Sequence, residues 1–242
     1  MKKTRQNEKP EPGFDLVRDQ APVALPKYQL AIFDLDGTLA DSFPWFLRVV
    51  NDVAREFDFR QIDADDVAEL RRKGSREILK FLGVPLWKLS MIAARMRSLK
   101  QSHLADISLF DGVTAMLKTL HDAGIVLALV SSDNEANARL QLGSDNAALF
   151  THFGCGASLF GKAAKFARVM KRAGVSPQQT IAIGDEARDF EAARAAGIAF
   201  GAVTWGYADS DSLRLLNPEV IFSSVDDIPI ALRGKHARQQ EN

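Results

Sequence analysis

The sequence has very little cysteine, because Cys155 is the only one among its 242 residues. A single cysteine cannot form a disulfide within the chain, which is typical of proteins that fold in a reducing compartment. We therefore expect a cytoplasmic protein. Cys155 lies in a segment with the pattern of a strand, and we interpret it as a small buried residue.

Long apolar runs are also missing, since no segment reaches the roughly 18 apolar residues of a membrane-spanning helix. Residues 1–9 are charged and lack the apolar centre of a signal peptide. Net charge is lacking too, because 31 Lys and Arg balance 31 Asp and Glu. Such a chain has no overall field to attract nucleic acid or an anionic membrane, so we expect neither as a partner.

What the chain does contain is a regular alternation of apolar runs and helical patterns. Strands alternating with helices of ~10–15 residues predict an α/β fold with a doubly wound parallel sheet. Residues 1–27 and 233–242 are polar and predict two tails. The expected strands are 29–34, 125–130, 152–157, 180–183, 198–204 and 220–222.

One long segment interrupts this alternation directly after the first strand. Residues 44–106 carry roughly four helical patterns and no convincing strand. We therefore predict an inserted helical unit, with the core formed by residues 28–43 and 107–232.

Polar clusters follow three of the expected buried strands. An ordinary strand ends in any turn residue, so one such cluster says little. The carboxyl ends of parallel strands meet at one edge of a sheet, however, so three clusters there predict a ligand site. The clusters are Asp34 with Asp36, Ser131 with Ser132, and Asp185 with Asp189.

The first cluster carries the most chemical information. Asp34 and Asp36 are two residues apart, so an extended backbone points both the same way. Two like charges on one side are unfavourable alone and favourable around a cation. Gly37 follows them and allows the backbone to approach a bound group closely.

Four segments together resemble the motifs of the haloacid dehalogenase-like hydrolases, most similar to phosphoglycolate phosphatases, over about residues 29–226. The resemblance implies a Rossmann-like core, with residues 44–106 as a cap over the site. The segments are Asp34-Leu35-Asp36-Gly37-Thr38, Ser131 at a strand end, Lys162 in Gly161-Lys162, and Gly184-Asp185-Glu186-Ala187-Arg188-Asp189.

This resemblance also implies a Mg²⁺-dependent phosphatase acting on a small phosphorylated metabolite. Asp34 would be the nucleophile that forms an aspartyl-phosphate, and Asp36 the acid and base. A phosphate ester and a carboxylate are both anions, so their reaction needs nearby positive charge. The implied metal residues are Asp34, Asp36 through a carbonyl near it, Asp185, and Asp189, which is expected to orient a metal-bound water or Lys162. The implied substrate-binding residues are Thr38, Ser131, Ser132, Lys162 and, in the cap loop Lys73-Gly74-Ser75-Arg76, Arg76.

Three alternatives remain open at this point. A phosphomutase of the β-phosphoglucomutase kind shares the core chemistry and differs in passing the phosphoryl group to a sugar hydroxyl. A 2-haloacid dehalogenase lacks the second acid of the first motif, and Asp36 is present here. A binding protein of the same fold would have lost turnover. We interpret Glu186 and Arg188 as surface charges and Trp205-Gly206-Tyr207 as loop packing, and the sequence does not predict an oligomeric state.

Overall fold

The computed structural model of this protein describes residues 26–156 and 161–233. The expected tails, 1–27 and 233–242, lie almost wholly outside the described residues. No helix in the described part of the chain is long and apolar enough to cross a membrane.

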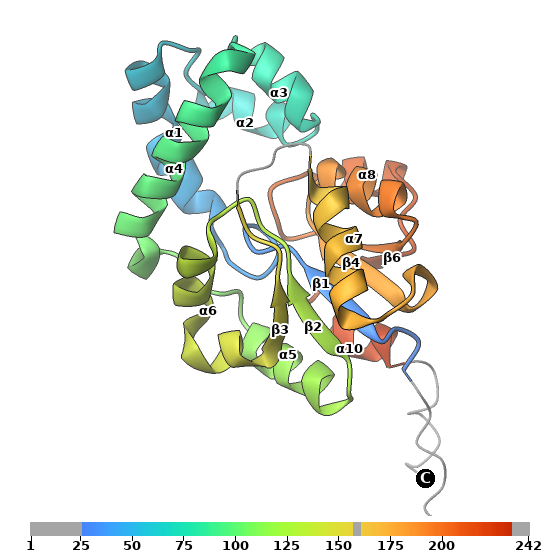
Figure 1. Ribbon diagram of the computed structural model, residues 1–242. Helices are drawn as coiled ribbons and strands as arrows, with labels where there is room; N and C mark the ends of the chain where they lie inside the picture. Colours follow the sequence, from blue (N-terminus) through green and yellow to red (C-terminus); the bar gives the residue numbers. More distant parts are fainter. Residues whose placement is uncertain (1–25, 157–160, 234–242) are drawn as a thin grey trace, which may run out of the picture.

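A single parallel sheet forms the core, with the strand order β3-β2-β1-β4-β5-β6 (Figure 1). The order runs outward in both directions from the central strand β1, which confirms the predicted doubly wound α/β fold. The strands are β1 (Leu30–Phe33), β2 (Val126–Leu129), β3 (Phe150–Phe153), β4 (Thr180–Gly184), β5 (Ala199–Val203) and β6 (Val220–Phe222).

The third strand was predicted too late in the chain. It ends at Phe153, before Gly154-Cys155-Gly156, and Gly156 has a positive φ of 112° that a strand does not accommodate. Cys155 therefore lies in the loop after β3, where it is partly buried. Burial raises the pKa of its thiol to about 11.

The central strand shows why the sheet is covered on both sides. All four residues of β1 are buried, and their side chains alternate between the two faces. Ala31 and Phe33 pack into the cluster that contains α5, α6 and α10. Leu30 and Ile32 pack into the opposite cluster, which contains α7, α8 and α9.

Within residues 26–156 and 161–233, six helices belong to this core, and two of them, α9 and α10, were not predicted. Both are only six residues long, and helices this short depend on packing against the sheet. The core helices are α5 (Val113–Asp122), α6 (Glu135–Leu149), α7 (Lys162–Ala173), α8 (Ala187–Ala196), α9 (Ser210–Leu215) and α10 (Asp227–Leu232).

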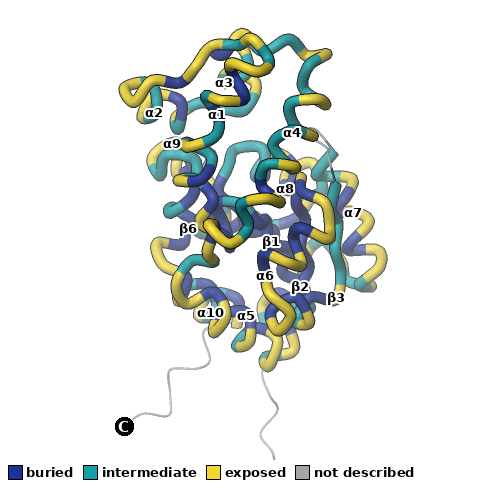
Figure 2. The backbone as a smooth tube through the Cα atoms, turned by 90° about the vertical axis from the view of Figure 1, so that its left-hand side faces the viewer, coloured by how far each residue is buried: buried dark blue, intermediate teal, exposed yellow. Residues whose placement is uncertain are grey.

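The inserted segment forms a separate helical lobe beside the core (Figures 1 and 2). Its small apolar centre consists of Val50, Ile62, Leu70 and Leu82. Much of the lobe is partly or fully exposed, whereas the buried backbone concentrates in the sheet (Figure 2). The lobe helices are α1 (Phe43–Phe57), α2 (Ala64–Leu70), α3 (Ser75–Phe81) and α4 (Leu89–Ser102).

Candidate active site

The chain leaves β1 through a compact turn. The N–H of Asp34 still donates to the carbonyl of Ile183, and then the Leu35 carbonyl accepts the N–H groups of the turn that follows. Gly37 in this turn has a φ of +77°, and a Cβ there would lie 2.2 Å from Asp185 Oδ2. The turn therefore requires glycine at position 37 for two reasons: the positive φ angle and the close approach of Asp185.

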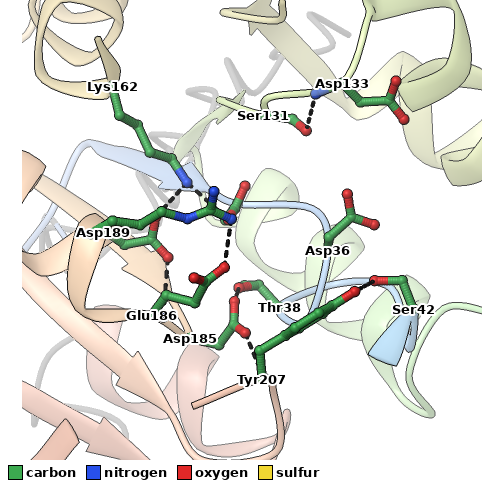
Figure 3. Close-up of polar contacts among 12 residues, drawn as sticks. Asp36, Thr38, Ser42, Ser131, Asp133, Lys162, Asp185, Glu186, Asp189 and Tyr207 are labelled. Atoms are coloured by element: carbon green, nitrogen blue, oxygen red, sulfur yellow. Dashed lines mark hydrogen bonds and ion pairs between the residues drawn. The ribbon is translucent and has the colours of Figure 1, made fainter. Parts of the chain in front are cut away.

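A lysine lies between two of the predicted carboxylates. Lys162 is the first residue of α7, and its Nζ lies 2.8 Å from Asp34 Oδ2 and 2.5 Å from Asp189 Oδ1. Figure 3 shows the Lys162 side chain extended toward Asp189. Burial opposes ionisation of Asp34, but the charges of Lys162 and Arg188 outweigh it and lower the Asp34 pKa. Asp34 is therefore an ionised carboxylate with a cation at hydrogen-bond distance.

Asp185 is fully buried and held on both oxygens. Thr38 Oγ1 donates to Oδ1 at 2.8 Å, and the N–H of Tyr207 donates to Oδ2 at 2.7 Å (Figure 3). Burial and the charges of Glu186, Asp189 and Asp34 raise the pKa of Asp185 well above its usual range. The carboxylate set here thus has more negative charge than the neighbouring side chains balance.

This excess suits a hard divalent cation. One oxygen from each of Asp34, Asp185 and Asp189 lies within 4.8 Å of the others. Carboxylate oxygens are the ligands that Mg²⁺ prefers. Asp189 already accepts hydrogen bonds from Lys162 and from the N–H of Glu186, whereas Asp185 accepts neutral donors. The residues present therefore fit a magnesium ion, with Asp34 and Asp185 better placed to hold it.

The second strand-end cluster lies across the site from the first. Ser131 is buried, and its Oγ accepts a hydrogen bond from the N–H of Asp133 at 3.0 Å, which leaves its own hydroxyl proton for another acceptor. Ser132 is exposed and lines the cavity described below. Behind them, Lys165 donates to the carbonyls of Ser131 and Gly156 and so supports the loop.

Sequence reasoning missed a buried lysine that contacts the first cluster. Lys100 of α4 is 4% exposed, and its Nζ contacts Asp36 Oδ1 at 2.6 Å and Asp133 Oδ2 at 3.1 Å. Burial opposes its charge, but the two carboxylates outweigh burial and raise the Lys100 pKa. The available signal was its position, because Lys100 follows Met96 and Ala93 at helical spacing on the apolar face of α4.

Two interpretations of charged residues were wrong. Glu186 and Arg188 are partly buried and form an ion pair at 2.5 Å beside Asp34, instead of lying on the surface. The Nε–H of Arg188 is buried and has no hydrogen-bond partner among the described residues. Glu186 and Arg188 face the site because α8 begins there, with its first turn packed at the strand end.

The loop after β5 does more than fill space. Tyr207 donates its N–H to Asp185 and its ring hydroxyl lies 3.1 Å from Ser42 Oγ. Arg71, at the end of α2, donates to the carbonyls of Gly206 and Tyr207, both at 2.9 Å. The interpretation as simple loop packing was therefore incomplete, since this loop joins the helical lobe to Asp185.

A cavity of about 990 Å³ lies between the lobe and the core. Lys73, Gly74 and Ser75 line it as expected, whereas Arg76 is exposed on α3 and is not a lining residue. The hydroxyl of Thr38 donates to Asp185. The phosphoryl contacts expected of Thr38 and of Arg76 both stay predictions. Apolar residues from the lobe, among them Phe43, Trp45, Phe46, Ile92, Ala93 and Met96, face polar residues from the core, among them Asp36, Ser132, Asp133, Glu186 and Arg188.

Known proteins resemble this chain over most of its length. The family model described as "Haloacid dehalogenase-like hydrolase" matches residues 31–203. The chain is 32% identical to the phosphoglycolate phosphatase of Synechococcus elongatus over 201 residues, which are 83% of this chain and 95% of that protein. It is 35% identical to the phosphoglycolate phosphatase of Xanthomonas campestris over 194 residues, 75% of this chain and 86% of that protein.

Solved structures agree on the fold. The structure of a putative phosphoglycolate phosphatase from Lactobacillus plantarum has a TM-score of 0.71 at 22% identity, covering 85% of this chain and 99% of that one. At this identity, the similarity establishes the shared architecture alone.

Proposed function

This chain belongs to the haloacid dehalogenase-like hydrolases as a phosphatase-type member, and we propose that it hydrolyses a small phosphomonoester in a Mg²⁺-dependent reaction through an aspartyl-phosphate. One observation carries the proposal: the buried Asp34 carboxylate lies 2.8 Å from Lys162 Nζ and shares a cluster of oxygens within 4.8 Å of one another with the candidate metal ligand Asp185. A nucleophile in that position has cations available on two sides when the metal is bound.

In the first step, an oxygen of Asp34 attacks the phosphorus atom, and the bond from phosphorus to the leaving oxygen breaks. Asp36 donates a proton to that oxygen, so the product leaves as an alcohol. Asp36 then takes a proton from water, which attacks the aspartyl-phosphate and releases inorganic phosphate. Asp36 is partly exposed beside the cavity, where an incoming ester and a water molecule have access.

The remaining residues hold the phosphoryl group and its charge. Bound Mg²⁺ supplies positive charge that offsets the repulsion between Asp34 and the phosphate oxygens. Lys162 adds a second cation, held in place by Asp189, and the hydroxyl of Ser131 adds a neutral donor. Asp34 and Asp185, with a carbonyl near Asp36, would hold the ion, and Asp189 would act through Lys162.

For the substrate, we propose a phosphoglycolate-like ester, because two relatives that match most of this chain are phosphoglycolate phosphatases. A phosphomutase remains distinguishable by experiment, since the aspartyl-phosphate would then pass to a sugar hydroxyl instead of water.

The test is a screen of small phosphate esters with and without Mg²⁺, measured as release of inorganic phosphate. Asp34→Asn is expected to lower kcat by at least about a thousandfold, because the amide cannot attack phosphorus. Asp52→Asn, which changes an exposed carboxylate of α1, is the matched control and is expected to keep normal turnover. Full Mg²⁺-dependent turnover in Asp34→Asn would contradict the proposal.

A further inference from the structure

A lysine of the helical lobe contacts the proposed acid and base of the core. Lys100 lies near the end of α4, 64 residues along the chain from Asp36, yet its Nζ is 2.6 Å from Asp36 Oδ1. The lysine side chain is 5% exposed, whereas that of Asp36 is 25% exposed. The lysine end of the contact is thus shielded from solvent, whereas the carboxylate end is accessible to it.

The geometry of a carboxylate gives this contact a consequence. Both oxygens lie in one plane, so a bond that anchors Oδ1 also restricts the direction in which Oδ2 points. In Asp36, Oδ1 is taken by Lys100, and Oδ2 is the oxygen left to exchange a proton with a substrate or water. An acid displaced by about 1 Å loses much of its effect, so an anchor of this kind affects the rate.

The same ammonium group also contacts a third segment of the chain. Lys100 Nζ lies 3.1 Å from Asp133 Oδ2. The other oxygen of Asp133 accepts from the N–H of Asn134 at 2.7 Å and from Asn137 Nδ2 at 3.1 Å. Asp133 is therefore a fixed point of the core, since it is buried and held by its own loop and by α6.

We propose that Lys100 is a positioning residue that makes the alignment of Asp36 depend on the place of the helical lobe, an inference that rests on the proposed phosphatase function. Asp36 is aligned while α4 lies against the core with Lys100 between Asp36 and Asp133. When the lobe moves away, Lys100 leaves with it and the proposed acid and base loses its anchor. Proton transfer is thereby tied to a covered site, where less water competes with the substrate.

The test uses two esters of similar size that differ in their leaving group, phenyl phosphate and p-nitrophenyl phosphate. Phenolate leaves poorly and needs a proton, whereas p-nitrophenolate leaves well without one. Lys100→Met is therefore expected to lower kcat/KM about tenfold or more for phenyl phosphate and less than about threefold for p-nitrophenyl phosphate. Lys88→Met is the matched control, because Lys88 is a lobe lysine that donates to the carbonyl of Phe57 within the lobe.

A second variant separates positioning from folding. Lys100→Met leaves Asp133 as a buried charge without its cation, which alone can destabilise the protein. In Lys100→Met with Asp133→Asn that charge is gone, so we expect the melting temperature to recover while the selective loss on phenyl phosphate persists.

Equal losses on both esters, or recovery of phenyl phosphate hydrolysis in the double variant, would show that Lys100 acts only through the fold and would overturn the inference. A wild-type protein that hydrolyses no phosphomonoester would overturn the proposed function, and this inference with it.

Discussion

At the scale of single residues, the site depends on two glycines, of which only Gly37 was part of the predicted site. A Cβ at Gly37 or at Gly206 would collide with Asp185, at 2.2 Å from its Oδ2 and 2.3 Å from its Cβ, respectively. Gly37 belongs to a motif visible in the sequence, whereas Gly206 lies in a loop read as packing. The two glycines enclose Asp185 from segments far apart in the chain, and so they set where the carboxylate can point.

Gly206→Ala tests this enclosure. The added methyl group must push Asp185 or the loop aside, so we expect a stability loss of about 1–3 kcal/mol and a drop of at least about tenfold in kcat/KM. Thermal unfolding and steady-state kinetics measure the two effects. Unchanged values of both would mean that the loop moves without disturbing Asp185.

At the scale of elements, two polar contacts between the lobe and the core reach the site itself. One is the Lys100 contact from α4, and the other is Arg71 at the end of α2, which donates to Gly206 and Tyr207. The N–H of Asp209 also donates to the carbonyl of Arg71 at 2.8 Å. The lobe therefore contacts both Asp36, the proposed acid and base, and the loop that holds Asp185.

Arg71→Ala removes the second of these connections. A hydrogen bond from a charged group contributes about 1.5–3 kcal/mol, so losing two is expected to loosen the lobe and lower kcat/KM about three- to tenfold. Arg48→Ala, at an exposed arginine of α1, is the control and should behave as the wild type. Faster proteolysis of Arg71→Ala between the lobe and the core would support the same explanation; kinetics equal to those of the control would argue against it.

At the scale of the whole molecule, a chain with no net charge contains a site in which negative charges outnumber positive ones. Formal charge balances overall, yet the carboxylates of Asp34, Asp185, Glu186 and Asp189 meet only Lys162 and Arg188 among the described residues of this cluster. The balanced composition therefore excludes an overall electrostatic field, whereas the carboxylate cluster carries local negative charge that a bound cation would neutralise.

The stability of the metal-free protein should depend on pH because of this excess of negative charge. The raised pKa of Asp185, caused by burial and by Glu186, Asp189 and Asp34, means that the folded metal-free protein binds a proton more tightly than the unfolded chain. Its stability is therefore expected to fall as pH rises from the ordinary carboxyl range toward that raised pKa.

Added Mg²⁺ should raise the melting temperature above that range, since it binds the folded state. Asp185→Asn should weaken the pH dependence, part of which remains because burial also raises the pKa of Glu186 and of Asp189. It should remove the Mg²⁺ response without destabilising the metal-free protein. Calorimetry across pH, with and without Mg²⁺, checks all three expectations. An identical Mg²⁺ response in Asp185→Asn would show that residues other than Asp185 bind the ion.

The sequence by itself determined the parallel sheet, the helical insertion and the strand-end clusters. These follow from local patterns: buried strands are continuously apolar, helices repeat every 3.6 residues, and the polar residues that end a parallel strand meet at one edge. That is why the sequence alone predicts Asp34, Asp36 and Asp185 as a group, and why the resemblance adds Lys162.

Only the tertiary structure decided which distant residues complete the site. Lys100 reaches Asp36 and Arg71 reaches Gly206 because the lobe packs against the core in one orientation, and no periodicity within α2 or α4 encodes that orientation. Glu186 and Arg188 are partly buried for a similar reason, since the packing of α8 against the strand end removes much of their surface from solvent. Local patterns report the period and polarity of a segment, whereas contacts between segments depend on how their surfaces fit together.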